Sequence, residues 1–311
     1  MKNKLKILIT STSFTDTPGQ HQEKLKSLNY KIDILRGPVK EQVLLPIIGN
    51  YDGIICGDDE ITSKVISNGK QGKLKVISKY GIGLDKIDLK SADEFGIKVC
   101  NTPGVNHITV SEHILALLFS YYKNIHLEYN ITKEGKWERL IGHEIYGKKI
   151  GIVGYGRIGN ELAQRCKAFG LTVKAYDPHV SKKTISDSDI VFLDNIINLV
   201  GEIDILALTL PLNKETEGMI NEKVINSASK KMVIVNTSRA LVVNQKDLIK
   251  SLKANKIKAY LTDVLEEEPM IQNHPLNEFE NVIITPHIGS RTYESVQRQG
   301  LMAVENLIKN I

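Results

Sequence analysis

Cysteine is scarce in this chain of 311 residues. The three cysteines, Cys56, Cys100 and Cys166, are widely spaced in apolar surroundings. This usage argues against a disulfide framework and against a metal site, and it is typical of buried, reduced thiols. We therefore expect a cytoplasmic protein without a bound metal.

Long apolar runs are also missing. The run Ile7, Leu8 and Ile9 near the N-terminus is far shorter than the core of a signal peptide. No segment approaches the roughly eighteen apolar residues that a membrane-spanning helix needs. The sequence predicts neither export nor insertion into a membrane.

Blocks of basic residues are absent as well. The 41 Lys and Arg and the 36 Asp and Glu give a net charge of +5, spread along the chain without interleaved aromatic residues. Nucleic-acid-binding chains cluster their basic residues on one face or along one segment. We therefore exclude a nucleic-acid partner and expect a mild attraction for anionic substrates.

The chain does contain short apolar runs in a regular rhythm. With 41% hydrophobic and 25% charged residues, the composition is that of a soluble globular protein, and the length favours two domains. Strands alternating with helical stretches indicate parallel, doubly wound sheets. The expected strands are 6–10, 53–56, 74–78, 149–153, 172–176, 205–209, 232–236, 258–261 and 282–285. The expected helices are 106–122, 160–169 and 291–309.

A glycine-rich turn follows the expected strand 149–153. Its glycines are Gly154, Gly156 and Gly159, and they permit a tight turn, close approach of a pyrophosphate and close helix packing. Asp177 ends the next strand, where a carboxylate can accept hydrogen bonds from ribose hydroxyls. Because Asp177 would repel a ribose phosphate, the sequence predicts NAD rather than NADP.

Three chemically active side chains follow later strands. Arg239, Glu268 and His287 each have an ordinary explanation alone: a surface arginine at a capping turn, a solvated acidic run and a structural histidine. Together with a dinucleotide they provide a cationic anchor and a carboxylate-supported imidazole. These are the parts needed to move a hydride to or from a 2-hydroxy or 2-oxo acid.

The combined motifs resemble the D-isomer-specific 2-hydroxyacid dehydrogenase family over nearly the full length. The resemblance implies that Arg239 orients the substrate, Glu268 supports the histidine and His287 is the acid and base. It assigns to the cofactor Gly154, Gly156, Arg157, Ile158, Gly159, Asp177, Thr109, Thr209, Pro211, Thr237, Ser238, Asp263 and Gly289. It assigns to the substrate Lys79, Gly81, Ile82, Gly83, Arg139 and Arg239. The backbone amides of residues 79–85 match the carboxylate-binding loop of the family.

The resemblance also implies a domain plan. Residues 1–100 and 288–311 would form a flavodoxin-like substrate-binding domain, and residues 101–287 an inserted NAD-binding Rossmann domain. Because the chain ends after the helix 291–309, we expect no C-terminal regulatory domain. A homodimer through the helix 108–122 is expected as well.

Within the family, the chain is similar to D-3-phosphoglycerate dehydrogenases through the segment 135–139, in which Arg139 matches an arginine that helps to bind the substrate phosphate. Serine biosynthesis is the implied context. Lys79 stands where these enzymes often have an arginine, and Glu94 stands where some of them have a basic residue. Reduction of hydroxypyruvate or glyoxylate is therefore an alternative function. A different class also stays open, an NAD(H)-sensing binding protein of the corepressor type. A formate- or phosphite-oxidising relative is a minor alternative.

Overall fold

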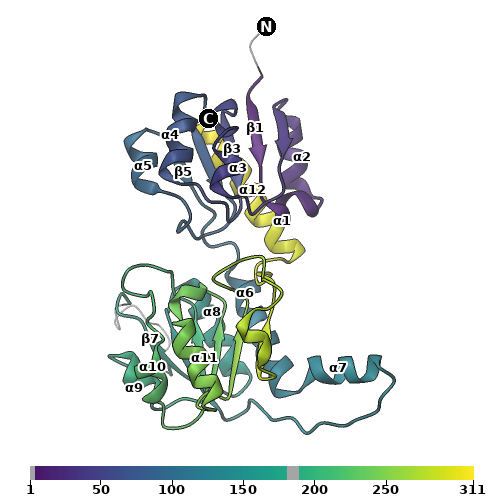
Figure 1. The fold of residues 1–311 in the computed structure, drawn as a ribbon, viewed down its shortest axis with the longest axis vertical. Helices are drawn as coiled ribbons and strands as arrows, with labels where there is room; N and C mark the ends of the chain where they lie inside the picture. The colour runs from purple at the N-terminus through teal and green to yellow at the C-terminus, as the bar shows by residue number, and fades with distance from the viewer. Residues whose placement is uncertain (1–3, 181–188) are drawn as a thin grey trace. The chain divides into compact units, whose positions relative to one another are not determined.

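The computed structural model describes residues 4–180 and 189–311, and these form two compact units. Unit 1 comprises residues 1–106 and 290–311, and unit 2 comprises residues 107–289. The nested α/β arrangement predicted from the sequence is confirmed (Figure 1). The units divide after Asn106 and Gly289, a few residues later than the expected positions 100 and 287.

Unit 1 is built on a parallel five-stranded sheet in the order β2-β1-β3-β4-β5. The strands are β1 (Lys6–Ile9), β2 (Lys31–Ile34), β3 (Gly53–Cys56), β4 (Val76–Lys79) and β5 (Lys98–Cys100). The helices are α1 (Thr12–Asp16), α2 (Gln20–Ser27), α3 (Glu41–Leu44), α4 (Ser63–Gln71), α5 (Leu89–Glu94) and α12 (Tyr293–Asn310).

Side chains of successive residues in these strands enter two separate cores. Ile54 and Ile77 pack in one cluster, whereas Ile55 and Val76 pack in the other against α12. Both faces of the sheet are therefore covered, as expected for parallel strands.

Unit 2 contains a seven-stranded sheet in the order β12-β11-β10-β9-β6-β7-β8, and each described pairing is parallel. Its strands are β6 (Lys149–Val153), β7 (Thr172–Tyr176), β8 (Val191–Phe192), β9 (Ile205–Leu208), β10 (Val233–Asn236), β11 (Ala259–Thr262) and β12 (Val282–Ile284). Its helices are α6 (His107–Tyr122), α7 (Ile125–Lys133), α8 (Arg157–Ala168), α9 (Ile196–Val200), α10 (Glu222–Asn226) and α11 (Gln245–Lys253).

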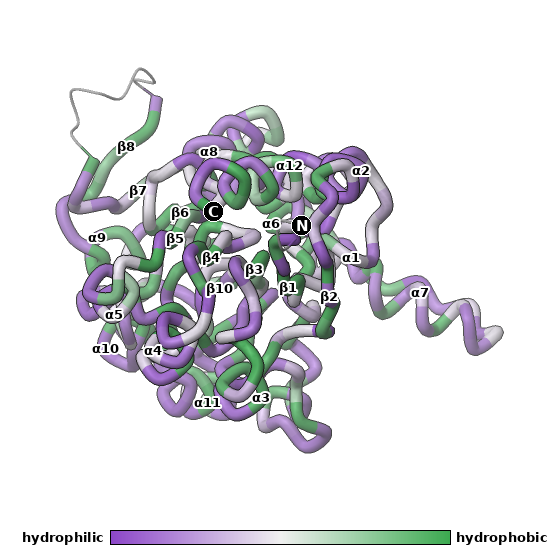
Figure 2. The backbone as a smooth tube through the Cα atoms, turned by 90° about the horizontal axis from the view of Figure 1, so that it is seen from above, coloured by the Kyte–Doolittle hydropathy of each residue, from purple (hydrophilic) through white to green (hydrophobic). Residues whose placement is uncertain are grey.

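Two neighbouring helices of unit 2 have opposite environments. Half of the residues of α6 are buried, with Ile114 and Leu118 in the core that also holds Leu162 of α8. By contrast, α7 has no buried residue, and it projects together with the segment 134–143 from the body of its unit (Figures 1 and 2). We call α7 and residues 134–143 the arm.

The sequence predicts that no segment is long and apolar enough to span a membrane, and the helices of the structure can be compared with this expectation. Over residues 4–180 and 189–311, each helix is either too short or too polar to span a bilayer.

Candidate active site

Arg239 follows β10, and a buried asparagine shapes the turn that presents it. The Asn236 side chain accepts a hydrogen bond from the Ser238 amide at 3.0 Å and donates one to the Arg239 carbonyl at 3.0 Å. The Arg239 backbone is extended there, and its Nη1 donates to the Ser238 carbonyl at 2.8 Å. Asn236 was not singled out from the sequence, although an asparagine at a strand end is a common turn former.

His287 and Glu268 are brought together by the loops after β12 and β11. The His287 Nδ1 lies 2.8 Å from Glu268 Oε2. The other carboxylate oxygen, Oε1, accepts a hydrogen bond from the Leu265 amide at 2.9 Å, which fixes the orientation of the carboxylate. Because a carboxylate holds the proton on Nδ1, the ring nitrogen Nε2 is the one that can exchange a proton with a substrate.

The backbone of His287 is in the left-handed region, with φ at 53°. This conformation is uncommon for a residue other than glycine and costs about 1 kcal/mol or more. The next two amides, of Ile288 and Gly289, donate to the two carboxylate oxygens of Asp263 at 2.9 and 2.7 Å. Asp263 therefore holds the unusual turn that carries the histidine.

Asp263 is itself surrounded by donors. Thr285 Oγ1 donates to it at 2.6 Å, and His113 Nε2 lies 3.4 Å from the same oxygen. Burial alone would raise the pKa of Asp263, but the hydrogen bonds from His113, Thr285 and the Ile288 amide outweigh burial and lower the pKa below its usual value. The carboxylate stays charged, as a group accepting several hydrogen bonds should. Neither His113 nor Thr285 was predicted from the sequence.

The glycine turn fits a bound dinucleotide. A Cβ on Gly154 would lie 2.8 Å from Leu210, and one on Gly159 would lie 2.3 Å from the Gly154 carbonyl oxygen, so neither position admits a side chain. A Cβ on Gly156, just before α8, would meet no atom within 4 Å, so the backbone is open to a ligand there. The Thr237 hydroxyl is buried without a hydrogen-bond partner in the described structure, which suits a group that a ligand satisfies.

Asp177 faces the same glycine turn. Its carboxylate accepts a hydrogen bond from the Tyr155 amide at 2.7 Å and another from the His179 amide at 2.9 Å. A carboxylate offers about four acceptor positions, so two remain for the hydroxyls of a ribose. Thr209 Oγ1 donates to the Gly154 carbonyl at 2.6 Å and thereby ties β9 to the turn.

Over the described residues, there is no group of three or more His, Cys, Asp or Glu able to hold a metal ion.

The predicted carboxylate-binding loop lies in unit 1. Gly81, with φ at 127°, exchanges hydrogen bonds with Thr102: its amide donates to Oγ1 at 2.9 Å and its carbonyl accepts from the Thr102 amide at 3.0 Å. The Asn101 amide group donates to the Ile82 carbonyl at 2.8 Å. The loop after β4 is thus held to the end of β5. Lys79 at its start is buried and ion-paired with Asp58.

The structure does not bring Arg139 together with the other side chains predicted for the site in its own unit. Arg139 lies on the arm, whereas Arg239, Glu268 and His287 follow the adjacent strands β10, β11 and β12. The remaining residues assigned to the cofactor lie at the start of α6 (Thr109), at the start of α8 (Arg157 and Ile158), after β9 (Pro211) and after β10 (Ser238).

Comparison with known proteins identifies the chain's relatives. Residues 115–289 match the family model described as D-isomer specific 2-hydroxyacid dehydrogenase, NAD binding domain. The chain belongs to this family. It is 35% identical to a D-3-phosphoglycerate dehydrogenase of Methanocaldococcus jannaschii over 94% of this chain and 56% of that protein. It is 35% identical to a hydroxypyruvate reductase of Thermotoga maritima over 90% of this chain and 92% of that protein.

Solved structures of the 2-hydroxyacid dehydrogenase family agree with this assignment. The NAD⁺-bound 3-phosphoglycerate dehydrogenase of Entamoeba histolytica is 26% identical, with a TM-score of 0.80 over 98% of this chain and 94% of that chain. The present chain spans only about half the length of the archaeal phosphoglycerate dehydrogenases that it matches, 56% and 53%. NAD as the cofactor agrees with the family model.

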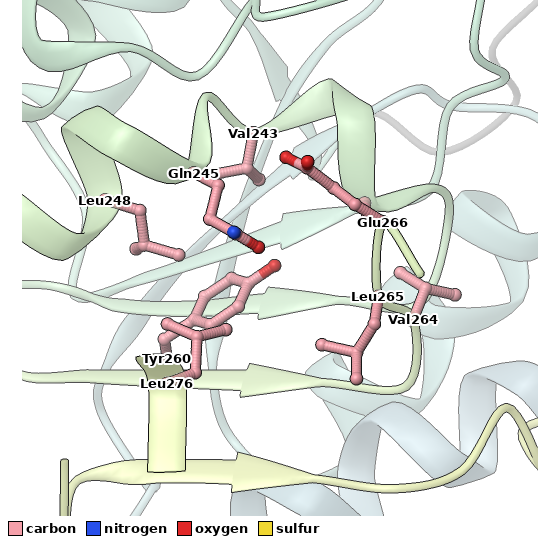
Figure 3. Close-up of a pocket in the computed structure, with 9 residues that line it drawn as sticks. Val243, Gln245, Leu248, Tyr260, Val264, Leu265, Glu266 and Leu276 are labelled. Atoms are coloured by element: carbon pink, nitrogen blue, oxygen red, sulfur yellow. The ribbon is translucent and has the colours of Figure 1, made fainter. Parts of the chain in front are cut away.

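A small pocket adjoins the segments that carry Arg239 and Glu268. The pocket has room for about one water molecule. Figure 3 shows Gln245, Tyr260 and Glu266 among the side chains that line it. The lining residues are Ala240, Val243, Gln245, Leu248, Tyr260, Val264, Leu265, Glu266 and Leu276. The pocket thus adjoins the chain neighbours of the predicted catalytic residues and includes none of their side chains.

Replacing Asp177 should relax the choice between NADH and NADPH. In Asp177→Ser, the ribose loses its carboxylate acceptor and a ribose phosphate is no longer repelled. We expect the ratio of kcat/KM for NADH to that for NADPH to fall by about tenfold or more, which corresponds to roughly 1.4 kcal/mol. Steady-state kinetics with both cofactors measures this ratio. An unchanged ratio would contradict the role given to Asp177, and Glu217→Ser, at an exposed position, is the surface control.

Proposed function

We propose that the protein is an NAD-dependent dehydrogenase that interconverts a short 2-hydroxy acid and the corresponding 2-oxo acid. The observation that carries this proposal is the 2.8 Å contact between His287 Nδ1 and Glu268, at the carboxyl ends of β12 and β11. The strand β11 lies between β12 and β10, the strand that presents Arg239. Ligands of parallel α/β sheets bind at the carboxyl ends of the strands. The family membership supports the same reaction class.

The proposed chemistry divides between the cofactor and the side chains. Bound NAD would supply the hydride acceptor, and NADH the donor. In oxidation His287 Nε2 takes the hydroxyl proton, and in reduction it returns that proton to the C2 oxygen. Glu268 orients the ring and stabilises its charged form. Arg239 holds the substrate carboxylate and polarises the C2 oxygen, a bidentate task that suits a guanidinium.

Two substrate classes have separate support. The segment around Arg139 and the likeness to D-3-phosphoglycerate dehydrogenases favour a phosphorylated acid, 3-phosphoglycerate. The likeness to a hydroxypyruvate reductase favours an unphosphorylated acid, as does the pairing of Lys79 with Asp58.

A substrate panel tests the proposed function. NADH oxidation by the purified protein is measured with 3-phosphohydroxypyruvate, hydroxypyruvate, glyoxylate, pyruvate and 2-oxoglutarate, for wild type and Arg139→Ala. Preference for the phosphorylated acid that disappears in Arg139→Ala would support phosphoglycerate as the substrate. Turnover of the other acids regardless of Arg139 would support a general 2-oxoacid reductase. No turnover of any acid would contradict the dehydrogenase and favour an NAD(H)-sensing binding protein.

We also propose that the protein is a homodimer, and that the arm provides much of the contact. The helix α6 buries five aliphatic residues and Tyr122 within its own unit and leaves Ile108 38% exposed, whereas Trp137 and Ile141 of the arm are 82% and 94% exposed. Wild type should elute at twice the mass of the 34.8 kDa chain, and Trp137→Glu with Ile141→Glu should elute as a monomer. Light scattering after size exclusion measures this. Ile34→Glu, at another exposed apolar site, is the control, and a monomeric wild type would contradict the proposal.

A further inference from the structure

The turn that carries His287 is held by groups outside its own three residues. The His287 amide donates to the Thr285 carbonyl at 2.9 Å, and the amides of Ile288 and Gly289 donate to the Asp263 carboxylate. A Cβ on Gly289 would lie 2.8 Å from Asp263 Oδ2, so the turn and the carboxylate are in direct contact. Because the left-handed backbone of His287 is uncommon for a histidine, the position of its imidazole depends on Thr285 and Asp263.

The Thr285 hydroxyl connects this turn to α6. It donates to Asp263 Oδ1 at 2.6 Å, and His113 Nε2 lies 2.9 Å from the same hydroxyl oxygen. A hydroxyl has one proton to donate, and here the charged carboxylate receives it. Toward His113 the hydroxyl oxygen is therefore an acceptor, which requires a proton on His113 Nε2. A chain of donors runs from His113 through Thr285 to Asp263.

His113 supports the carboxylate that holds the turn. Its side chain is 16% exposed, and Nε2 also lies 3.4 Å from Asp263 Oδ1. The ring packs against the turn as well, since a Cβ on Gly289 would be 3.4 Å from its Cδ2. Burial raises the pKa of Asp263, and the hydrogen bond from His113 is foremost among the contacts that bring this pKa below its usual value. His113 therefore favours the charged form of Asp263, which is the form that accepts from the turn amides.

The helix α6 does not need His113 to stay in place. On the same helix Val110, Ile114 and Leu117 are buried, and Ile114 belongs to a core cluster of unit 2. Loss of the imidazole should therefore leave α6 packed on its sheet while it removes the link between the helix and the turn. The role of His113 can be tested separately from the stability of the fold.

We propose that His113 is a positioning residue, which acts through Thr285 and Asp263 to hold His287 in place for proton transfer. The inference deepens the proposed function and rests on it. Proton transfer requires His287 Nε2 within hydrogen-bond reach of the C2 oxygen, and a displacement of about 1 Å can cost about 10²-fold in rate. A side chain on a packed helix gives the loop that carries His287 the rigidity that this precision needs.

Two substitutions at position 113 separate the proposed role from simple packing. His113→Leu removes the donor, so kcat for the reduction of hydroxypyruvate with NADH should fall about 10- to 100-fold. His113→Gln keeps an N–H donor, so its kcat should stay within about threefold of wild type. In both variants KM for hydroxypyruvate should change less than about twofold, because Asn236 holds the turn of Arg239 independently.

Glu112→Leu is the matched control for these variants. Glu112 is the preceding residue of α6, and its exposed side chain pairs with Arg165 at 3.5 Å instead of contacting Asp263. A leucine there should change kcat less than about twofold, since it alters the same helix without touching the donor chain. Steady-state and single-turnover kinetics measure all of these variants.

A double-mutant cycle with His287→Ala shows whether His113 acts through His287. In the His287→Ala background, His113→Leu should change the residual rate less than about twofold, because the side chain that it positions is gone. Equal losses in the two backgrounds would overturn the proposal. It would also be overturned by a wild-type kcat in His113→Leu, or by a loss that glutamine does not restore.

Nuclear magnetic resonance of protein containing ¹⁵N-labelled histidine tests the same link without turnover. The ring signals of His113 and His287 are identified by their absence from His113→Gln and His287→Ala. In wild type, His113 should carry a proton on Nε2. His287 should carry one on Nδ1 that exchanges slowly with water, because Glu268 holds it. This exchange should be faster in His113→Leu and unchanged in His113→Gln.

The ring signals distinguish a failure of this inference from a failure of the proposed function. A His113 ring without a proton on Nε2 in wild type would overturn the donor chain, even if His113→Leu does not fold. An unchanged His287 signal in folded His113→Leu would overturn the positioning role. Absence of turnover with every 2-oxo acid would overturn the dehydrogenase, whereas the His287 signal would still show whether His113 positions that ring.

Discussion

His287→Ala should lower kcat by about 10²- to 10⁴-fold, the range that a positioned acid and base contributes. The substitution removes the ring that lies 2.8 Å from Glu268, and with it the proposed donor and acceptor of the proton. NADH binding should change little, because the glycine turn and Asp177 belong to a different part of the unit 2 sheet. Single-turnover kinetics with NADH and hydroxypyruvate, together with NADH fluorescence titration, measures the two effects separately.

Glu268→Gln is the informative companion to this variant. Glutamine can still accept from the Leu265 amide but no longer carries the charge that favours the protonated ring. As the pH rises, the rate of reduction should therefore fall at a lower pH than in wild type, while the protein remains folded.

A His287→Ala protein that retains more than about a tenth of the wild-type kcat would show that the proton comes from elsewhere.

Arg239→Ala should cause the second large loss, a fall in kcat/KM of about 10³-fold. The guanidinium is given two tasks, holding the carboxylate and stabilising the developing charge at the C2 oxygen, so both KM and kcat should change. The turn itself should survive, since Asn236 holds it through the Ser238 amide and the carbonyl of residue 239.

Arg239→Lys separates charge from geometry. Lysine keeps the positive charge but cannot form the bidentate fork. In Arg239→Lys, KM should therefore lie closer to its wild-type value than kcat does. If lysine restored both parameters to wild-type values, the fork would have no special role. If alanine left kcat/KM within about tenfold of wild type, Arg239 would not be the substrate anchor.

The sequence was a good guide to strands buried on both faces. Strands such as β3 and β10 are fully buried and therefore appear as uninterrupted apolar runs. The strands β2, β5 and β8 were not predicted, because they lie at sheet edges and their residues are exposed or only partly buried. The helix α7 was missed for a related reason, since it buries no side chain and lacks a clear apolar stripe.

The three predicted catalytic side chains could be found because each follows a strand in a distinctive local motif. The meeting of His287 and Glu268 depends on β11 and β12 being neighbours, which periodicity alone does not reveal. The pairing of Lys79 with Asp58 likewise joins the ends of β3 and β4, far apart in the sequence. Local patterns indicate residue types, whereas sheet order decides which of them meet.

The carboxylate of Asp263 has a consequence for how this site can evolve. One side chain is shared by α6 through His113, by the end of β12 through Thr285, and by the turn that presents His287. Changes at these positions cannot have independent effects, because each alters the partner that the others depend on. A substitution at His113, Thr285 or Asp263 therefore changes which residues the other positions can accept. During evolution these positions should change together with the turn that carries His287.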